Sequence, residues 1–187
     1  MKKLKVVFFG TPDFAKESLA AIHYSNHEVV GVVTVADKPS GRGQKLTESP
    51  VKKYAVENNL PVFQPEKLRN PEFLEKMRKL EADVFVVVAF RMMPKVLFEM
   101  PKLGTFNLHA SLLPDYRGAA PINFAIINGE EKTGATTFFI NEKIDEGNIL
   151  LQEELPILPD ENAGRRPARS TLFPLTLVVL TTIVLAA

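Results

Sequence analysis

Short apolar runs alternate with amphipathic segments along the chain. Three of the runs are rich in Val or Phe and predict buried strands, at residues 4–9, 29–35 and 83–89. Three other segments carry apolar residues at helical spacing, at residues 14–23, 50–58 and 71–80. The last two begin with Ser49 or Asn70 followed by proline, which is typical of a helix start. This alternation predicts an α/β fold with a largely parallel sheet.

The pattern continues in the second half of the chain, where more strands and another helix are predicted. The strands are expected at residues 104–108, 135–140 and 149–155, and the helix at residues 121–128, ended by Gly129. In an open α/β sheet, ligands bind beyond the carboxyl ends of the strands. Asn107, His109 and the loop after Ala89 all fall at such ends. The sequence therefore predicts that a site lies at this edge of the sheet.

Asn107 and His109 are the strongest candidates for chemistry because both can act on a carbonyl group. Strand side chains alternate between faces, so positions 107 and 109 lie on the same side of the strand. An Asn amide donates hydrogen bonds without titrating, whereas an imidazole can accept a proton or, when charged, donate to an oxyanion. His109 needs a third group to fix its tautomer, and Asp145, in a turn between two apolar runs, is the candidate. The alternative is a structural histidine at a strand end, with Asn107 as a turn former.

Composition narrows the class of protein and the kinds of site. The 187 residues, 45% hydrophobic and 24% charged, suit one folded domain that is neither disordered nor fibrous. A net charge of +1 gives no global attraction for nucleic acid, so such contact requires a local basic surface. The absence of cysteine and the presence of only three histidines argue against disulfides, thiol catalysis and a metal site. The N-terminus lacks the features of a signal peptide, so a cytoplasmic location is expected.

The turn Gly10-Thr11-Pro12 follows the first predicted strand, where a phosphate-binding loop would lie. It lacks the second and third glycines that let the backbone approach a pyrophosphate. We therefore predict no nucleotide cofactor at this turn, and we expect Asp13 to cap the helix that follows.

The stretch Asn107-Leu108-His109-Ala110-Ser111-Leu112-Leu113-Pro114 is followed by Arg117-Gly118-Ala119-Ala120-Pro121 and, further on, by Asp145. The first motif with the carboxylate resembles the formyltransferase family, and the second narrows the resemblance to the methionyl-tRNA formyltransferases. The resemblance covers residues 1–164 and implies the Rossmann-like formyltransferase fold, a mostly parallel sheet flanked by helices. It implies transfer of a formyl group from 10-formyltetrahydrofolate to the amino group of methionyl initiator tRNA. It also implies a cytoplasmic monomer that needs neither a metal nor a membrane.

The resemblance assigns catalytic roles to the three candidate residues. Asn107 would polarise the formyl oxygen and hold the charge of a tetrahedral intermediate. His109 would act as acid, base or oxyanion donor, and Asp145 would hold its ring and manage protons. Which of His109 and Asp145 takes the proton of the amine stays open.

The resemblance also assigns binding roles to three loops. Folate would contact Ser111, Leu112, Leu113 and Pro114. The loop at residues 89–94 would line the pterin pocket, and Arg42, in the polar loop at residues 36–45, would contact tRNA. From local composition alone, the loop at residues 36–45 is equally a solvated connector. On the same evidence, the loop at residues 89–94 is more readily a strand-to-helix connector, and residues 111–114 form an ordinary loop.

Three rival readings of the function remain. A formyltransferase acting on a sugar-nucleotide amine would share the Asn, His and Asp set, but Ala119 and the basic loop argue against it. A formyltransferase acting on a purine-precursor amine would share Ser-Leu-Leu-Pro but usually departs from the motif at residues 117–121. The third reading is an inactive truncated product.

The carboxyl end departs from the preceding pattern. After Gly164 the sequence has no acidic residue and becomes rich in Leu, Val and Thr. We predict an incomplete catalytic domain at residues 1–164 and an aberrant hydrophobic tail at residues 165–187, out of the original reading frame and outside the native fold. The family's C-terminal tRNA-binding domain would then be absent. A transmembrane helix is the alternative, but the 17 residues after Ser170 fall short of the ~20 needed to span a bilayer.

Overall fold

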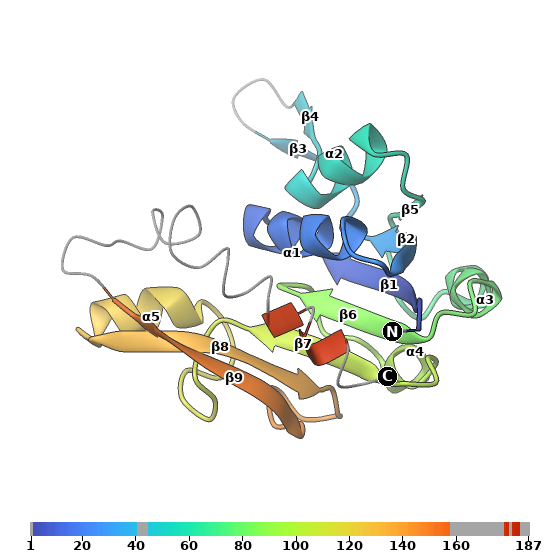
Figure 1. Ribbon diagram of the computed structural model, residues 1–187. Helices are drawn as coiled ribbons and strands as arrows, with labels where there is room; N and C mark the ends of the chain where they lie inside the picture. Colours follow the sequence, from blue (N-terminus) through green and yellow to red (C-terminus); the bar gives the residue numbers. More distant parts are fainter. Residues whose placement is uncertain (1, 41–44, 158–177, 180, 184–187) are drawn as a thin grey trace.

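The computed structural model describes residues 2–40, 45–157, 178–179 and 181–183. Its main sheet has seven strands in the order β5-β2-β1-β6-β7-β8-β9 (Figure 1). The first five strands of this order run parallel, and β8 and β9 are antiparallel to their neighbours. These strands are β1 (Lys5–Gly10), β2 (Glu28–Val33), β5 (Val62–Phe63), β6 (Val84–Val88), β7 (Thr105–His109), β8 (Lys132–Phe139) and β9 (Ile149–Pro156). The predicted α/β class with a mostly parallel sheet is confirmed.

The sequence predicts four of the helices in the described residues, and the short helix at residues 95–98 was not predicted. They are α1 (Asp13–His23), α2 (Pro50–Glu57), α3 (Pro71–Lys79), α4 (Lys95–Phe98) and α5 (Pro121–Ile127). Ser49 Oγ accepts the Lys52 N–H at 3.0 Å, and Asn70 Oδ1 accepts the Glu72 N–H at 2.8 Å, so both predicted caps are confirmed. The predicted cap at Asp13 is wrong. Pro12 occupies the cap position, and Asp13 is the first helical residue, 3.6 Å from Lys16 Nζ.

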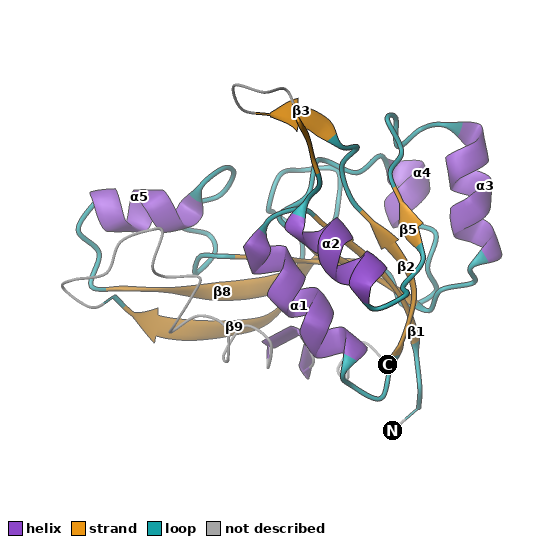
Figure 2. Cartoon of the chain, turned by 90° about the horizontal axis from the view of Figure 1, so that it is seen from above, coloured by secondary structure: helices purple, strands orange, loops and turns teal. Residues whose placement is uncertain are grey.

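The two faces of the sheet are buried separately. Val6 and Phe8 of β1 belong to one apolar cluster, with residues of α1 and α2, whereas Val7 and Phe9 belong to a second cluster, with residues of α3 and α4. This division follows from the alternation of side chains along a strand. Figure 2 shows the two helix pairs on opposite sides of the sheet. A strand buried on both faces needs continuous apolar sequence, which is what made β1 and β6 recognisable.

Some elements differ from the prediction. Residues 36–45, expected as a loop, contain β3 (Lys38–Ser40), which pairs antiparallel with β4 (Lys45–Thr47). Strand β8 begins at Lys132 rather than at residue 135, and Gly134 lies inside the strand. A Cβ at Gly134 would lie 2.2 Å from the carbonyl oxygen of Glu153, so the close approach of β9 requires glycine there.

The described part of the tail packs against the sheet. Val178, Val179 and Ile183 are at most 2% exposed and belong to the apolar cluster that covers the α1 face. Thr182 Oγ1 lies 2.7 Å from Thr137 Oγ1 of β8. The prediction that the tail takes no part in the fold is therefore wrong for these residues, while the domain boundary at residue 164 stays a prediction. Among the described residues, none of the helices has the length and apolar character needed to cross a bilayer.

Candidate functional site

A cavity of about 840 Å³ opens at the carboxyl ends of β1, β6 and β7. From β1 the chain adds strands first on one side and then on the other, so that β1 and β6 flank a topological switch point (Figure 1). At such a point the loops that follow the two strands run in opposite directions, and a crevice forms between them. Pro12 follows β1, Ala89 follows β6 and His109 ends β7, and all three line the cavity. The cavity thus lies at the sheet edge that the sequence singles out.

Asn107 lies in the floor of the cavity, in the middle of a row across three strands. It pairs with Val87 of β6 on one side and with Phe138 of β8 on the other, and all three residues line the cavity. Within the described part of the chain, the Asn107 side chain makes no hydrogen bond. Its amide is therefore available to a ligand and lies between two apolar neighbours.

His109 lies two residues beyond Asn107 and is held by the backbone of the following loop. Its side chain is 8% exposed, and its Nε2 lies 2.9 Å from the carbonyl oxygen of Tyr116. Because a carbonyl oxygen only accepts, Nε2 carries the hydrogen of this bond. The other ring nitrogen, Nδ1, is therefore the one whose proton can come and go. It lies 3.7 Å from Asp145 Oδ2.

Asp145 approaches His109 from a tight turn between β8 and β9. Its Oδ2 accepts the Gly118 N–H at 2.8 Å, and its side chain is 14% exposed. The turn closes through Gly147, where a Cβ would lie 1.6 Å from the carbonyl oxygen of Phe139, so only glycine fits. The sequence-predicted trio of Asn107, His109 and Asp145 is thus brought together, with the carboxylate fixed by a backbone donor.

This arrangement combines a neutral donor with a proton-handling pair. The amide of Asn107 can donate to an oxygen that gains negative charge, and the Nδ1 of His109 can exchange a proton beside a carboxylate. The 3.7 Å between Nδ1 and Asp145 is longer than a hydrogen bond, so a small shift of either side chain closes the contact. The geometry suits reactions in which a carbonyl carbon becomes tetrahedral.

The predicted folate-binding stretch at residues 111–114 is not part of the lining of this cavity. Ser111 is fully buried and Leu113 is 5% exposed, and neither they nor Leu112 and Pro114 are among the residues that line the cavity. Thr136 of β8 donates to the Ser111 carbonyl at 2.7 Å and accepts the Leu113 N–H at 3.1 Å. Ser111 and Leu113 therefore anchor the loop after His109 to β8, and the contact of residues 111–114 with folate stays a prediction.

The loop at residues 89–94 does line the cavity, as expected. Arg91 fixes this loop, because its guanidinium donates to the carbonyl oxygens of Pro65 and Glu66 and lies 5.5 Å from the Phe90 ring centre. Burial lowers the pKa of Arg91 from its ordinary value. The loop is therefore a fixed wall, with the side chains of Phe90 and Met93 available for a flat apolar ligand.

The charges around the cavity favour an anionic ligand. The described lining residues include four cations and two anions besides His109: Arg69, Arg91, Lys95, Lys143, Glu142 and Asp145. Lys95 lies 3.6 Å from Glu142, which offsets part of this charge. No group of three or more His, Asp or Glu side chains placed to hold a metal ion occurs among the described residues, and independence of a metal stays a prediction.

Backbone strain collects at the site. Six described residues other than glycine have positive φ, and four of them lie at the site. One is Asp145 of the trio (51°), and the others are Ala89 (46°), Tyr116 (56°) and Ala120 (55°). Such conformations persist only where the surrounding structure holds them, and they are frequent at functional sites. Ala89, Ala120 and Asp145 line the cavity directly.

The predicted tRNA contact, Arg42, lies outside the described residues. The strands on either side of it are described, and they belong to the β3–β4 hairpin. Its role therefore stays a prediction.

Two contributors were missed at the sequence level, Tyr116 and Gly118. They act through a backbone carbonyl and a backbone N–H, which every non-proline residue has. The available signal was the turn-rich run at residues 115–121, where glycine marks the positive φ of 89° that aims the Gly118 N–H at Asp145.

Known proteins share the sequence and the fold. The family described as formyl transferase matches residues 2–172. Over 165 residues the chain is 60% identical to the methionyl-tRNA formyltransferase of Flavobacterium johnsoniae, covering 88% of this chain and 52% of that protein. Over 164 residues it is 55% identical to the methionyl-tRNA formyltransferase of Bacteroides fragilis, covering 87% and 51%. The chain thus spans about half the length of these curated relatives.

Solved structures match over nearly the whole chain. The phosphoribosylglycinamide formyltransferase of Bacillus halodurans superposes with a TM-score of 0.80 at 20% identity, covering 98% of this chain and 95% of that chain. A formyltetrahydrofolate deformylase from Pseudomonas syringae pv. tomato superposes with a TM-score of 0.74 at 19% identity, covering 97% and 60%. At these identities the structures establish the fold alone. Because the family model matches residues 2–172 of the 187, the chain belongs to the formyl transferase family.

Proposed function

We propose that this chain transfers the formyl group of 10-formyltetrahydrofolate to the α-amino group of methionyl initiator tRNA. The observation that carries the proposal is the convergence of Asn107, His109 and Asp145 on one cavity. That convergence supports acyl transfer, and 60% identity to a methionyl-tRNA formyltransferase supports the acceptor. The proposal places the protein in the cytoplasm, with no membrane partner.

Asn107 stabilises the negative charge that develops on the formyl oxygen. The amine nitrogen attacks the formyl carbon, the carbon becomes tetrahedral, and its oxygen gains a negative charge. The amide N–H of Asn107 donates to that oxygen from the floor of the cavity. A single oxyanion donor of this kind contributes about 3 to 4 kcal/mol to the lowering of the barrier.

His109 and Asp145 handle the proton. The new carbon–nitrogen bond forms first, and the bond from the formyl carbon to N10 of the folate breaks when the tetrahedral intermediate collapses. Over the two steps the amine loses a proton and N10 gains one. Because Nε2 of His109 is bound to the Tyr116 carbonyl, the proton passes by way of Nδ1, beside Asp145. The two groups act as one unit in this transfer.

The cavity also suits the proposed substrates. The rings of the folate require flat apolar walls, and Phe90, Met93 and Ile140 line the cavity. The carboxylates of folate and the phosphates of tRNA are anions, and cations predominate among the described charged side chains of the lining.

The test compares acceptors for one formyl donor. The full 187-residue chain is incubated with 10-formyltetrahydrofolate and methionyl initiator tRNA, free methionine, glycinamide ribonucleotide or an amino-sugar nucleotide. We expect kcat/KM for the tRNA to exceed that for each small amine by at least about 100-fold. A higher value for a small amine would overturn the acceptor, and formylation of none of them would overturn the activity.

A further inference from the structure

The loop at residues 110–116 returns to the end of the strand that it leaves. His109 ends β7, and the carbonyl oxygen of Tyr116 lies 2.9 Å from His109 Nε2. The position of the hydrogen on the imidazole therefore depends on where the loop places one carbonyl group. The contacts that hold the loop act on His109 through this bond.

A row of three paired residues crosses the sheet at His109. His109 of β7 pairs with Thr136 of β8, and Thr136 pairs with Gln152 of β9, the three strands lying side by side (Figure 1). Residues paired directly across neighbouring strands have their side chains on the same face of a sheet. Thr136 and Gln152 therefore extend the face that bears the His109 side chain.

The hydroxyl of Thr136 uses its whole capacity for hydrogen bonds. Thr136 is fully buried, and its Oγ1 donates to the Ser111 carbonyl at 2.7 Å and accepts the Leu113 N–H at 3.1 Å. The amide nitrogen of Gln152 donates to the same Oγ1 at 3.0 Å and to the Leu113 carbonyl at 2.7 Å. A hydroxyl donates one hydrogen bond and accepts two. The two side chains thus satisfy three backbone groups of the loop.

The loop is closed on itself and seated directly on β8. Ser111 Oγ donates to the Asp115 carbonyl at 2.6 Å, and the Asp115 N–H donates to the Leu112 carbonyl at 3.0 Å. A Cβ at Gly134 would lie 2.5 Å from the Leu112 side chain, so glycine leaves room for this leucine against the strand. Tyr116 follows the closed segment directly. Its carbonyl is therefore placed by the same contacts that hold the loop to β8.

We propose that Thr136 and Gln152 are positioning residues, which hold the loop so that the Tyr116 carbonyl keeps the imidazole hydrogen of His109 on Nε2. The inference rests on the proposed function, in which the proton passes by way of Nδ1. If the carbonyl moved away, the neutral imidazole would exchange between its two tautomers. A fraction of the molecules would then carry the hydrogen on Nδ1, the nitrogen that has to receive the proton.

Strand β8 offers a matched pair of substitutions. Thr136→Val and Thr133→Val each replace a buried threonine by an apolar residue of similar shape. The Thr133 hydroxyl has no hydrogen-bond partner among the described residues, so its loss breaks no bond there, whereas Thr136→Val breaks three. Thr136→Ser keeps the hydroxyl. Gln152→Met removes only the amide donors at an exposed position, so it tests the same contacts if Thr136→Val fails to fold.

The experiment measures the tautomer of His109 and the kinetics of formyl transfer in the full chain. Nitrogen chemical shifts at about pH 8.5, where an ordinary imidazole is neutral, distinguish the two tautomers, and His109→Gln assigns the signals. Steady-state rates with 10-formyltetrahydrofolate and methionyl initiator tRNA give kcat and KM.

We expect Thr136→Val and Gln152→Met to give a mixture of tautomers. They should lower kcat about tenfold and about threefold respectively, with KM for both substrates within about twofold of wild type. Thr136→Ser and Thr133→Val are expected to keep the hydrogen on Nε2 and a kcat within about twofold of wild type.

Three results would overturn the positioning role. They are an unchanged tautomer in both Thr136→Val and Gln152→Met, unchanged kcat in a variant whose tautomers are mixed, and equal losses of kcat in Thr136→Val and Thr133→Val. Formylation of no acceptor by the wild-type chain would instead overturn the proposed function. The tautomer of His109 would then decide by itself whether Thr136 and Gln152 position the imidazole.

Discussion

His109 has one ring nitrogen committed to the backbone and the other facing a carboxylate, so only Nδ1 can take part in proton transfer. We expect Asn107→Ala and His109→Ala each to lower kcat by about two to three orders of magnitude, because each removes a group that acts on the tetrahedral intermediate. Steady-state formylation measures the loss, and circular dichroism checks the fold. Near-normal turnover in either variant would remove that residue from the proposed mechanism.

Asp145→Asn keeps the shape of the side chain and an acceptor for Gly118 while removing the negative charge beside Nδ1. We expect a loss of kcat of about two orders of magnitude and an altered pH–rate profile. A profile identical to that of the wild type would show that Asp145 does not act through His109.

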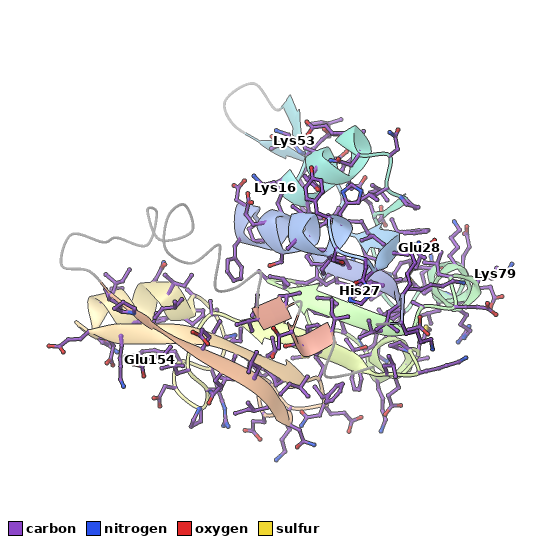
Figure 3. All side chains as sticks on the ribbon, in the orientation of Figure 1. Lys16, His27, Glu28, Lys53, Lys79 and Glu154 are labelled. Carbon is purple, nitrogen blue, oxygen red and sulfur yellow. The ribbon has the colours of Figure 1, made fainter. Side chains whose placement is uncertain are left out.

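His27 is a buried histidine whose role is structural. Its Nδ1 lies 3.4 Å from the Leu4 N–H, and it is 7% exposed at the start of β2 (Figure 3). Burial lowers the pKa of His27, so the unfolded chain binds its proton more tightly than the folded chain does. Stability from this residue is therefore full above about pH 6.5 and is lost as the pH falls below that value.

We expect the free energy of unfolding to fall more between pH 7.5 and pH 5.5 in the wild type than in His27→Gln, which cannot titrate. The difference is about 1.4 kcal/mol for every tenfold by which burial weakens proton binding. Urea denaturation at the two pH values provides the measurement. Parallel losses in both proteins would show that other groups govern the acid sensitivity.

At the scale of single residues, the sequence predicts side chains better than backbone groups. Positions 107 and 109 are two residues apart on a strand, so the sequence predicted that their side chains point to the same side. Both residues line the cavity. The partner of His109 Nε2 could not be found this way, because the Tyr116 carbonyl has no chemical signature in the sequence. The burial of Ser111 also depends on its bond to Thr136 of β8, which is distant in the sequence.

At the scale of elements, the loop after β7 carries the partners of both proton-handling residues. Tyr116 anchors this loop because its hydroxyl donates to Glu130 and accepts from Asn128 Nδ2 at 3.1 Å. The bond to Glu130 raises the pKa of Tyr116, so the hydroxyl stays protonated and donating. The ring thereby fixes the carbonyl that orients His109.

We expect Tyr116→Phe and Glu130→Gln to lower kcat about three- to tenfold with little change in KM, because a loosened loop misplaces His109. Glu131→Gln is the control, since its side chain is also exposed and it follows Glu130 directly before β8. Equal effects at positions 130 and 131 would mean that the anchor does not control the histidine.

Elements with a strong local pattern were predictable, and elements held from afar were not. Strand β6 is apolar throughout and was recognised, whereas β5 has two residues and α4 has four. The β3–β4 hairpin is polar, and its base depends on Lys52, which lies fifteen positions from Asp37. No local pattern reports such a contact.

At the scale of the whole molecule, the described residues of the tail, 178–179 and 181–183, pack against one face of the sheet. Val179 is fully buried there. We expect Val179→Ala to lower the free energy of unfolding by about 2 kcal/mol, because it removes buried methyl groups and leaves a cavity. Val56→Ala, at a position 57% exposed on α2, is expected to change it by less than about 0.5 kcal/mol.

Urea midpoints of the two variants decide between the structural role and the role predicted from sequence. If Val179→Ala lowered the free energy of unfolding as little as Val56→Ala does, the tail would have no structural role. The prediction from its abrupt composition would then hold.

The positive φ angles around the cavity have a consequence for how this protein would respond to selection. Ala89 and Ala120 hold backbone conformations that glycine adopts without a steric penalty. Laboratory evolution for heat resistance alone is therefore expected to collect glycine at these positions, each adding up to about 1 kcal/mol. The same replacements make the loops that position the reacting groups more flexible. Thermal stability would therefore rise while kcat falls. Lineages selected for both traits should keep the alanines and find their stability elsewhere in the molecule.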